Sequence, residues 1–248
     1  MTGWLLLRGL TRDQRHWGAF PQLLSAELDA PVAMLDPPGF GTEYRRRSPH
    51  TIAGIADDLR ARFEPGDGKW SVLGISLGGM LAMDWCARYP GDFERCVVVN
   101  TSAREVSSVR RMRWEPVSVF AGRSFRTPQA HESAVSRLTI NHPDVDRVAL
   151  AEAWAAYHSD TPVAPANALA QVVAAARFRL PQRIPVPLLV LAATHDRLAP
   201  FQMSQRIAGR YGAPLRLHPS AGHDLPVDDG PWVCRRIGEW LGNPQRGQ

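Results

Sequence analysis

Short apolar runs alternate with helical patterns through the first hundred residues and again near the C-terminal end. The strand-like runs lie at residues 4–8, 32–36, 70–75, 96–100, 187–192 and 215–217. Apolar residues at helical spacing occupy residues 17–28, 52–63, 80–89, 204–211 and 232–241. Strands that alternate with helices at this interval predict right-handed crossovers. We therefore expect an α/β fold, with a mostly parallel sheet covered by helices on both faces.

The middle of the chain breaks this alternation. From about residue 103 to residue 183 no comparable strand occurs, and helical patterns at 148–157 and 166–178 are separated by prolines. This change predicts a helical insertion, placed so that it lies over the carboxyl ends of the strands. The expected organisation is a core of residues 1–102 and 184–248 with a helical lid of residues 103–183.

Composition favours a globular protein without a membrane anchor. The 248 residues are 44% hydrophobic and 21% charged, and no apolar run reaches the roughly 18 residues of a membrane helix. A cytoplasmic location is the resulting expectation. The three cysteines, Cys86, Cys96 and Cys234, are widely spaced in apolar or helical contexts and are interpreted as reduced packing residues. We expect no metal site and no cofactor.

The positive charge, formally +5, raises nucleic acid as a partner. The basic residues are scattered, however, and only Lys69 among the 29 is a lysine, so the excess reflects a preference for arginine. We expect a small-molecule substrate, no nucleic-acid or membrane partner, and a monomer or homodimer. Two arginine clusters, at 45–47 and 110–113, are interpreted as solvated surfaces, with attraction of an anionic substrate as the alternative.

Ser76 lies in the most informative stretch of the sequence. It is the centre of Gly74-Ile75-Ser76-Leu77-Gly78, between an apolar strand and an apolar helical run. Glycines two residues before and after a serine let neighbouring backbone pack against a strained corner that presents the hydroxyl to a cleft. This pattern predicts a nucleophile elbow.

A serine hydroxyl is a weak nucleophile, so it needs a general base and a carboxylate that orients the base. In a parallel sheet such groups come from the carboxyl ends of strands. That rule selects Asp196, after the run at 187–192, and His223, in the loop after the last run. We interpret the other histidines as surface or packing residues: His16, His50, His131, His142, His158, His195 and His218.

The order Ser76, Asp196, His223 resembles the catalytic triad of the α/β-hydrolase superfamily. The turn Asp36-Pro37-Pro38-Gly39-Phe40-Gly41 is similar to the Asp-x-Pro-Gly-x-Gly turn of that family. Among its members the chain is most similar to small cytoplasmic carboxylesterases of the pimeloyl-ester esterase type. The resemblance implies a sheet shortened to about six strands, because the chain starts without the two antiparallel strands that often open the fold.

The resemblance also indicates the oxyanion hole and one departure from the family. The backbone N–H groups of Leu77, at the start of the elbow helix, and of Leu10 are the expected donors to a developing oxyanion. The family usually has His-Gly where this chain has Arg8-Gly9. Our hypothesis is that Arg8 forms an ion pair with Asp36.

The expected function is hydrolysis of a small to medium carboxylic ester through an acyl-enzyme. Two alternatives remain: cleavage of carbon–carbon bonds, as a hydrolase or lyase, on the same triad, and a ligand-binding member of the fold without turnover. Aromatic residues of the expected lid are either lid core or pocket lining. The pocket candidates are Trp114, Phe120, Phe125, Trp154 and Tyr157, with Met112 and Phe178 beside them.

Overall fold

The computed structural model describes residues 2–106 and 127–242, and its strands form one parallel sheet. The strands are β1 (Thr2–Leu7), β2 (Val32–Met34), β3 (Lys69–Ile75), β4 (Arg95–Val99), β5 (Leu188–Ala193) and β6 (Leu215–His218). Within these residues the sheet has six strands in the order β2-β1-β3-β4-β5-β6, every neighbouring pair parallel. From β1 the chain adds β2 on one side and then β3 on the other, so the strand order reverses between β1 and β3. Open parallel sheets bind ligands at such a point, outside the carboxyl ends of the strands. The predicted fold class is confirmed.

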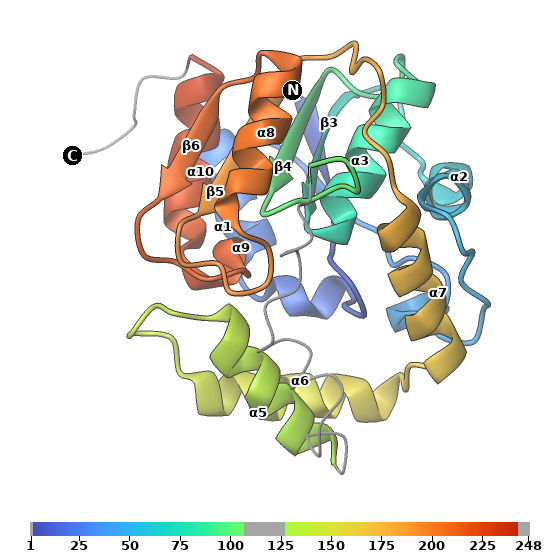
Figure 1. The fold of residues 1–248 in the computed structure, drawn as a ribbon, viewed down its shortest axis with the longest axis vertical. Coiled ribbons are helices and arrows are strands. Elements are labelled where there is room, and N and C mark those ends of the chain that lie inside the picture. Colours follow the sequence, from blue (N-terminus) through green and yellow to red (C-terminus); the bar gives the residue numbers. More distant parts are fainter. Residues whose placement is uncertain (1, 107–126, 243–248) are drawn as a thin grey trace.

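Helices cover both faces of this sheet (Figure 1). One face carries α1 (Phe20–Leu28) and α10 (Gly230–Trp240), and the other carries α2 (Ile52–Arg62), α3 (Leu77–Arg88) and α8 (Phe201–Tyr211). Three short elements complete the described part of the core: the helix α9 (Leu225–Asp228) and single turns at Gln14–Trp17 and Gly41–Glu43.

The apolar runs of the sequence supply both cores because successive strand residues point to opposite faces. Leu5 and Val72 belong to the cluster under α2, α3 and α8, whereas Leu6 and Leu73 belong to the cluster under α1 and α10. All four side chains have no exposed surface. The three cysteines are buried and form no disulfide, as the sequence predicted.

The turn between β3 and α3 is packed backbone against backbone. A Cβ atom placed on Gly74 would lie 2.1 Å from the Gly78 carbonyl oxygen. One placed on Gly78 would lie 2.0 Å from the carbonyl oxygen of Leu7, the last residue of β1. Such contacts are far inside van der Waals distance, so only glycine fits at either position. This packing fixes where α3 begins relative to the end of β1.

The helical insertion between β4 and β5 contains α5 (Pro128–Thr139), α6 (Arg147–Asp160) and α7 (Pro165–Arg177). In Figure 1, α5 and α6 lie together below the sheet, and α7 lies beside α2. The C-terminal end of α5 touches loops that follow the strands. The Thr139 carbonyl accepts from the Asp224 N–H at 3.0 Å, and the Asn141 amide donates to the His195 carbonyl at 3.3 Å. The insertion therefore lies over the carboxyl ends of β5 and β6.

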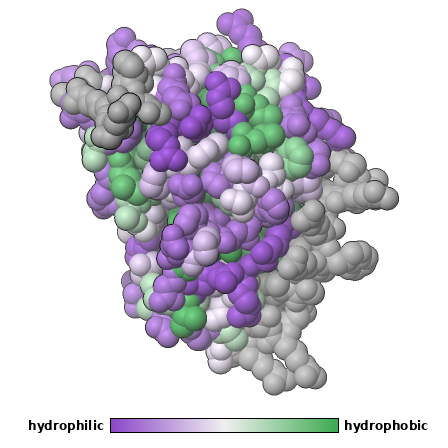
Figure 2. Space-filling model, turned by 90° about the vertical axis from the view of Figure 1, so that its left-hand side faces the viewer, coloured by the Kyte–Doolittle hydropathy of each residue, from purple (hydrophilic) through white to green (hydrophobic). Residues whose placement is uncertain are grey.

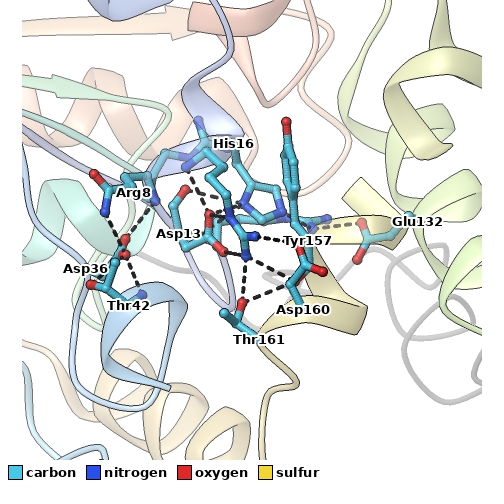
Figure 3. Close-up of polar contacts among 12 residues, drawn as sticks. Arg8, Asp13, His16, Asp36, Thr42, Glu132, Tyr157, Asp160 and Thr161 are labelled. Atoms are coloured by element: carbon cyan, nitrogen blue, oxygen red, sulfur yellow. Dashed lines mark hydrogen bonds and ion pairs between the residues drawn. The ribbon is translucent and has the colours of Figure 1, made fainter. Parts of the chain in front are cut away.

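The loop after β1 holds the insertion to the core (Figure 3). Three of its residues reach three helices of the insertion or their ends. The contacts run from the Thr11 N–H to Gln171 Oε1 at 2.9 Å, from Arg12 Nη1 to Glu132 Oε2 at 2.7 Å, and from Arg15 Nη2 to Thr161 Oγ1 at 2.6 Å. Residues 11–15 therefore couple the position of the insertion to the end of β1.

His16 is buried inside this loop in its neutral form. Its Nε2 atom lies 3.1 Å from Arg12 Nη1, which only donates, so Nε2 accepts and Nδ1–H faces the Asp13 carboxylate at 3.1 Å. Burial, and then the charge of Arg12, lower the pKa of His16 to about 4, against the opposing effect of Asp13. Protonation of His16 would place a positive charge against a guanidinium in a dry site.

The surface seen in Figure 2 is mostly hydrophilic, with hydrophobic residues in small separate patches. Among the described residues, none of the helices is both long and apolar enough to cross a membrane.

Replacement of Gly78 by alanine is expected to lower the free energy of unfolding by about 3 kcal/mol, because the new methyl group meets the end of β1. Urea unfolding of the purified proteins measures this change. Gly209→Ala is the matched control, since Gly209 lies in α8 with open space around it. The control is expected to gain about 0.5–1 kcal/mol from helix propensity. Equal stability of the two variants would contradict the packing described for the elbow.

His16 is expected to make the fold sensitive to acid. An unfolded histidine has a pKa near 6.5 and the folded value is about 4, so its contribution is complete above pH 6.5 and is lost as pH falls to 4. Between pH 7 and 4 the wild type should lose about 3 kcal/mol more unfolding free energy than His16→Gln. Urea unfolding across this range measures the difference, with exposed His195→Gln as the control. Parallel curves for the wild type and His16→Gln would refute the assignment.

Candidate active site

Ser76 occupies the corner between β3 and α3. Its backbone has φ +56° and ψ −118°, a conformation that side-chain-bearing residues rarely adopt and that stores strain at functional sites. The Ser76 N–H donates to the Val99 carbonyl at 2.8 Å, and the Ser76 carbonyl accepts from Thr101 Oγ1 at 3.1 Å. The residue is partly exposed, so the strained corner offers its hydroxyl at the carboxyl edge of the sheet.

His223 and Asp196 are joined by a short hydrogen bond. His223 Nδ1 donates to Asp196 Oδ2 at 2.7 Å, which leaves Nε2 without its proton in the neutral ring. The other carboxylate oxygen of Asp196 accepts from the N–H groups of Leu198 and Ala199 at 2.7 and 2.9 Å. The Asp196 carboxylate is therefore fixed by its own loop while it orients the imidazole.

The charges around His223 favour its protonated form. Burial disfavours the imidazolium, but the charge and hydrogen bond of Asp196, together with Asp224, outweigh burial and the opposing charge of Arg8. The pKa of His223 therefore lies above its usual value. Because its protonated form is stabilised, the neutral imidazole is suited to accept a proton from a nucleophile.

The second predicted contact of the triad, from Ser76 to His223, is not a hydrogen bond in this structure. Among the hydrogen bonds of the described ranges, 2–106 and 127–242, none joins the Ser76 hydroxyl to His223. Bonds of this kind are often long without substrate and tighten in the reacting complex. The assignment of Ser76, Asp196 and His223 as a triad thus stays a prediction, with one of its two contacts present.

The two expected oxyanion donors flank Ser76. Leu77 is the first residue of α3, where backbone N–H groups have no partner within the helix. Leu10 follows Gly9, and a Cβ atom on Gly9 would lie 3.3 Å from Ser76 Cβ and 3.8 Å from Ser76 Oγ. Gly9, the residue before Leu10, therefore lies beside the serine. The role of the Leu10 and Leu77 N–H groups as oxyanion donors stays a prediction.

Asn100 is a residue that the sequence reasoning passed over. The apolar run at 96–100 predicts it as the last residue of a buried strand, but β4 ends at Val99 and Asn100 has φ +47°. Its side-chain N–H group donates to the His223 carbonyl at 2.7 Å, and its Oδ1 accepts from the Ala193 N–H at 2.8 Å. Asn100 thus ties the histidine loop to the ends of β4 and β5. The available signal was a polar residue directly after an apolar strand.

The hypothesis of an Arg8–Asp36 ion pair is wrong. Arg8 instead binds Asp224, with Nη1 to Oδ1 at 2.9 Å and Nη2 to Oδ2 at 2.6 Å. The Asp36 carboxylate accepts from the Gln14 N–H at 2.7 Å and from the Thr42 N–H at 2.9 Å (Figure 3). Backbone donors therefore satisfy Asp36, and burial raises its pKa. Arg8 and Asp224 are 216 positions apart, so the residues near Arg8 in the sequence give no sign of this pairing.

The expected pocket aromatics are only partly described. Trp114, Phe120 and Phe125, together with Met112, lie outside the described residues. Trp154 is 2% exposed beneath the Arg12 guanidinium, and half-buried Tyr157 lies beneath that of Arg15. These two rings belong to the contact between the insertion and the loop after β1. Their role as substrate contacts stays a prediction.

Among residues 2–106 and 127–242, one group of side chains has metal-ligand chemistry. His131 and Glu132 of α5 and His158 of α6 offer ligand atoms that all lie within 4.8 Å of one another. The Glu132 carboxylate is already held by Arg12 at 2.7 Å, and the same arginine helps to lower the pKa of His131 after burial. A cation at this place would meet a buried guanidinium, which opposes its binding.

A cavity of about 570 Å³ lies at the other end of the sheet. Its lining includes Lys69 and Trp70 at the start of β3, and Glu94 just before β4. Ser76 and His223 follow the carboxyl ends of strands, so this cavity does not contain them.

Comparison with known proteins identifies the family of the chain. A family model described as "Serine aminopeptidase, S33" matches residues 16–229. The chain is 26% identical over 235 residues to "Putative carbamate hydrolase RutD" of Caulobacter vibrioides, covering 91% of this chain and 84% of that protein. It is 33% identical over 106 residues to "Biotin biosynthesis bifunctional protein BioHC" of Teredinibacter turnerae, covering 40% of this chain and only 17% of that protein.

Solved structures share the fold at low identity. A thermophilic esterase from Thermogutta terrifontis superposes with a TM-score of 0.72 at 21% identity, covering 98% of this chain and 90% of the esterase. A lipase-esterase related protein from Clostridium acetobutylicum gives 0.72 at 16% identity, with coverage of 96% and 93%. Since the family model spans most of the chain, this protein belongs to the family described as "Serine aminopeptidase, S33", within the α/β-hydrolase superfamily.

Proposed function

We propose that the protein is a serine hydrolase that cleaves a small to medium carboxylic ester through an acyl-enzyme. The observation that carries this proposal is the 2.7 Å bond from His223 Nδ1 to Asp196 Oδ2, at the same edge of the sheet as the strained, partly exposed Ser76. A buried histidine oriented by a carboxylate, at the same edge of the sheet as such a serine, supports acyl transfer as the reaction.

The proposed reaction has two halves, acylation of Ser76 and hydrolysis of the acyl-enzyme, and His223 acts first as base and then as acid in each. His223 Nε2 takes the proton of the Ser76 hydroxyl as its oxygen attacks the ester carbonyl carbon. The negative charge on the carbonyl oxygen is held by the N–H groups of Leu10 and Leu77. His223 then gives its proton to the leaving alcohol. Water then attacks the acyl-Ser76 ester as His223 Nε2 takes its proton. His223 returns that proton to Ser76 Oγ as the carbon–oxygen bond to Ser76 breaks, which releases the acid and restores the enzyme.

The choice of an ester has indirect support. Solved structures of similar fold include proteins described as esterases, and the partial match to BioHC agrees with the resemblance to pimeloyl-ester esterases. The family description and the match to RutD place amide and carbamate bonds beside esters as candidates. Cleavage of carbon–carbon bonds on the same triad and ligand binding without turnover remain the alternatives.

Replacement of Ser76 by alanine is expected to lower turnover of a short p-nitrophenyl ester by about 10⁴-fold or more, because the acyl-enzyme no longer forms. The same variant should lose labelling by a fluorophosphonate probe. Ser71→Ala is the control: Ser71 lies on the same strand, fully buried, and its hydroxyl has no hydrogen-bond partner among the described residues. Full activity in Ser76→Ala would overturn the proposal.

Replacement of His223 by glutamine is also expected to reduce kcat by about 10⁴-fold, since the general base is lost. His195→Gln tests the neighbouring imidazole, which lies beside Asp196 in the sequence but is exposed. This control should keep activity within about twofold, because surface substitutions away from a site have small effects. Steady-state kinetics on an ester, an aminoacyl amide, a carbamate and a ring-fission dienone separate the candidate reactions. If His195→Gln lost activity and His223→Gln did not, the general base would be His195 and the assignment of His223 would be wrong.

A further inference from the structure

Arg8 and Asp224 form a buried ion pair with two parallel hydrogen bonds, Nη1 to Oδ1 at 2.9 Å and Nη2 to Oδ2 at 2.6 Å. Their side chains are only 4% and 6% exposed. The face of the guanidinium lies 4.7 Å from the centre of the Trp17 ring. Arginine is suited to such a place because its planar fork matches a carboxylate and its face stacks on an indole.

This pair joins the loop after β1 to the loop after β6, and the proposed reaction needs a fixed distance between these two loops. Arg8 directly precedes Gly9 and Leu10, whose N–H is the expected oxyanion donor, and Asp224 directly follows His223. The backbone on either side of the pair is also fixed. The Leu7 and Arg8 carbonyls lie against Gly78, and the His223 carbonyl accepts from Asn100 at 2.7 Å.

Stability alone does not account for the pair. Removing two charges from water is costly, and well-packed apolar side chains in place of a buried ion pair often stabilise a protein equally well or better. What a doubly bonded pair provides beyond burial is a fixed distance and a fixed angle between its two backbones. At this position, that angle is the one between an oxyanion donor and a general base.

We propose that Arg8 and Asp224 are positioning residues, which set the Leu10 N–H and the His223 imidazole at the separation that one substrate carbonyl requires. The proposal rests on the hydrolase reaction proposed above. It gives a role to Arg8 at the position where the family usually has histidine. Neither side chain needs to touch the substrate, because the effect passes through the adjacent backbone.

The pair also has a distinct electrostatic effect on the base. The charged groups facing His223 are Asp196 from the loop after β5, Asp224 from its own loop, and Arg8 from the loop after β1. Asp224 raises the pKa of His223 and Arg8 lowers it, so the two effects oppose each other. Loss of the Asp224 charge alone leaves Arg8 unopposed and shifts the pKa of His223 downward.

The test compares Asp224→Asn, Arg8→Lys and the double variant Arg8→Gln/Asp224→Asn with the wild-type chain on an ester that it hydrolyses. Asp224→Asn should lower kcat by about 100-fold with little change in KM, because displacement by an ångström has this cost. The acid limb of its kcat/KM profile should move to lower pH. Arg8→Lys, which keeps the charge and one bond, should also lower kcat, but by less than Asp224→Asn does.

The double variant separates position from charge. It lacks both charges, so its acid limb should return toward that of the wild type while kcat stays low. Asp58→Asn is the matched control, since Asp58 forms a doubly bonded pair with Arg46 on the surface. Circular dichroism and thermal unfolding verify that each variant is folded, and Arg8→Lys is the mildest of them.

Two results would overturn the proposal. One is a wild-type kcat and pH profile in Asp224→Asn. The other is a loss of stability in Asp224→Asn, Arg8→Lys and the double variant while all three keep the wild-type kcat. An unfolded Asp224→Asn leaves the decision to Arg8→Lys, whose kcat must fall if the fork sets the geometry. Failure of the proposed function looks different. In that case the wild type hydrolyses none of the substrates and Ser76 resists the fluorophosphonate probe.

Discussion

Close backbone packing at the carboxyl ends of β1 and β3 is the constraint on which the rest of the site depends. Gly74, Gly78 and the Leu7 carbonyl meet at distances that exclude any side chain. This contact forces the turn that puts Ser76 at a positive φ and starts α3 beside the loop that carries Leu10. One steric contact therefore sets the relative positions of Ser76, the first residues of α3 and the end of β1.

Buried charges then connect this rigid corner to the more distant parts of the site. Arg8 binds Asp224 beside His223, and Arg12 binds Glu132 in the insertion, each pair with little exposure to water. Asp13 lies between Arg15 and His16 in the same loop, and these partners, against the opposing effect of burial, hold the pKa of its carboxyl well below its usual range. A buried charge without a partner is costly, so a conformation of the loop after β1 that separates these pairs is unfavourable.

The same loop faces two parts of the protein at once. Its first residues pass over Ser76, and its later residues bind α5, α6 and α7 of the insertion through Arg12, Arg15 and Thr11. A change in the position of the insertion therefore acts directly on the segment that carries the Leu10 amide. This arrangement offers a physical route by which the insertion affects the backbone beside Ser76.

The sequence by itself determined the sheet, the elbow and the order of Ser76, Asp196 and His223. These depend on local signals: apolar runs for buried strands, glycines at fixed offsets, and polar residues just after strands. Only the tertiary structure decided the partner of Arg8, the part played by Asn100, and the packing of Trp154 on Arg12. A buried charge takes whichever partner the fold brings near, and for Arg8 that partner lies 216 residues away, at a distance over which sequence spacing carries no geometric information.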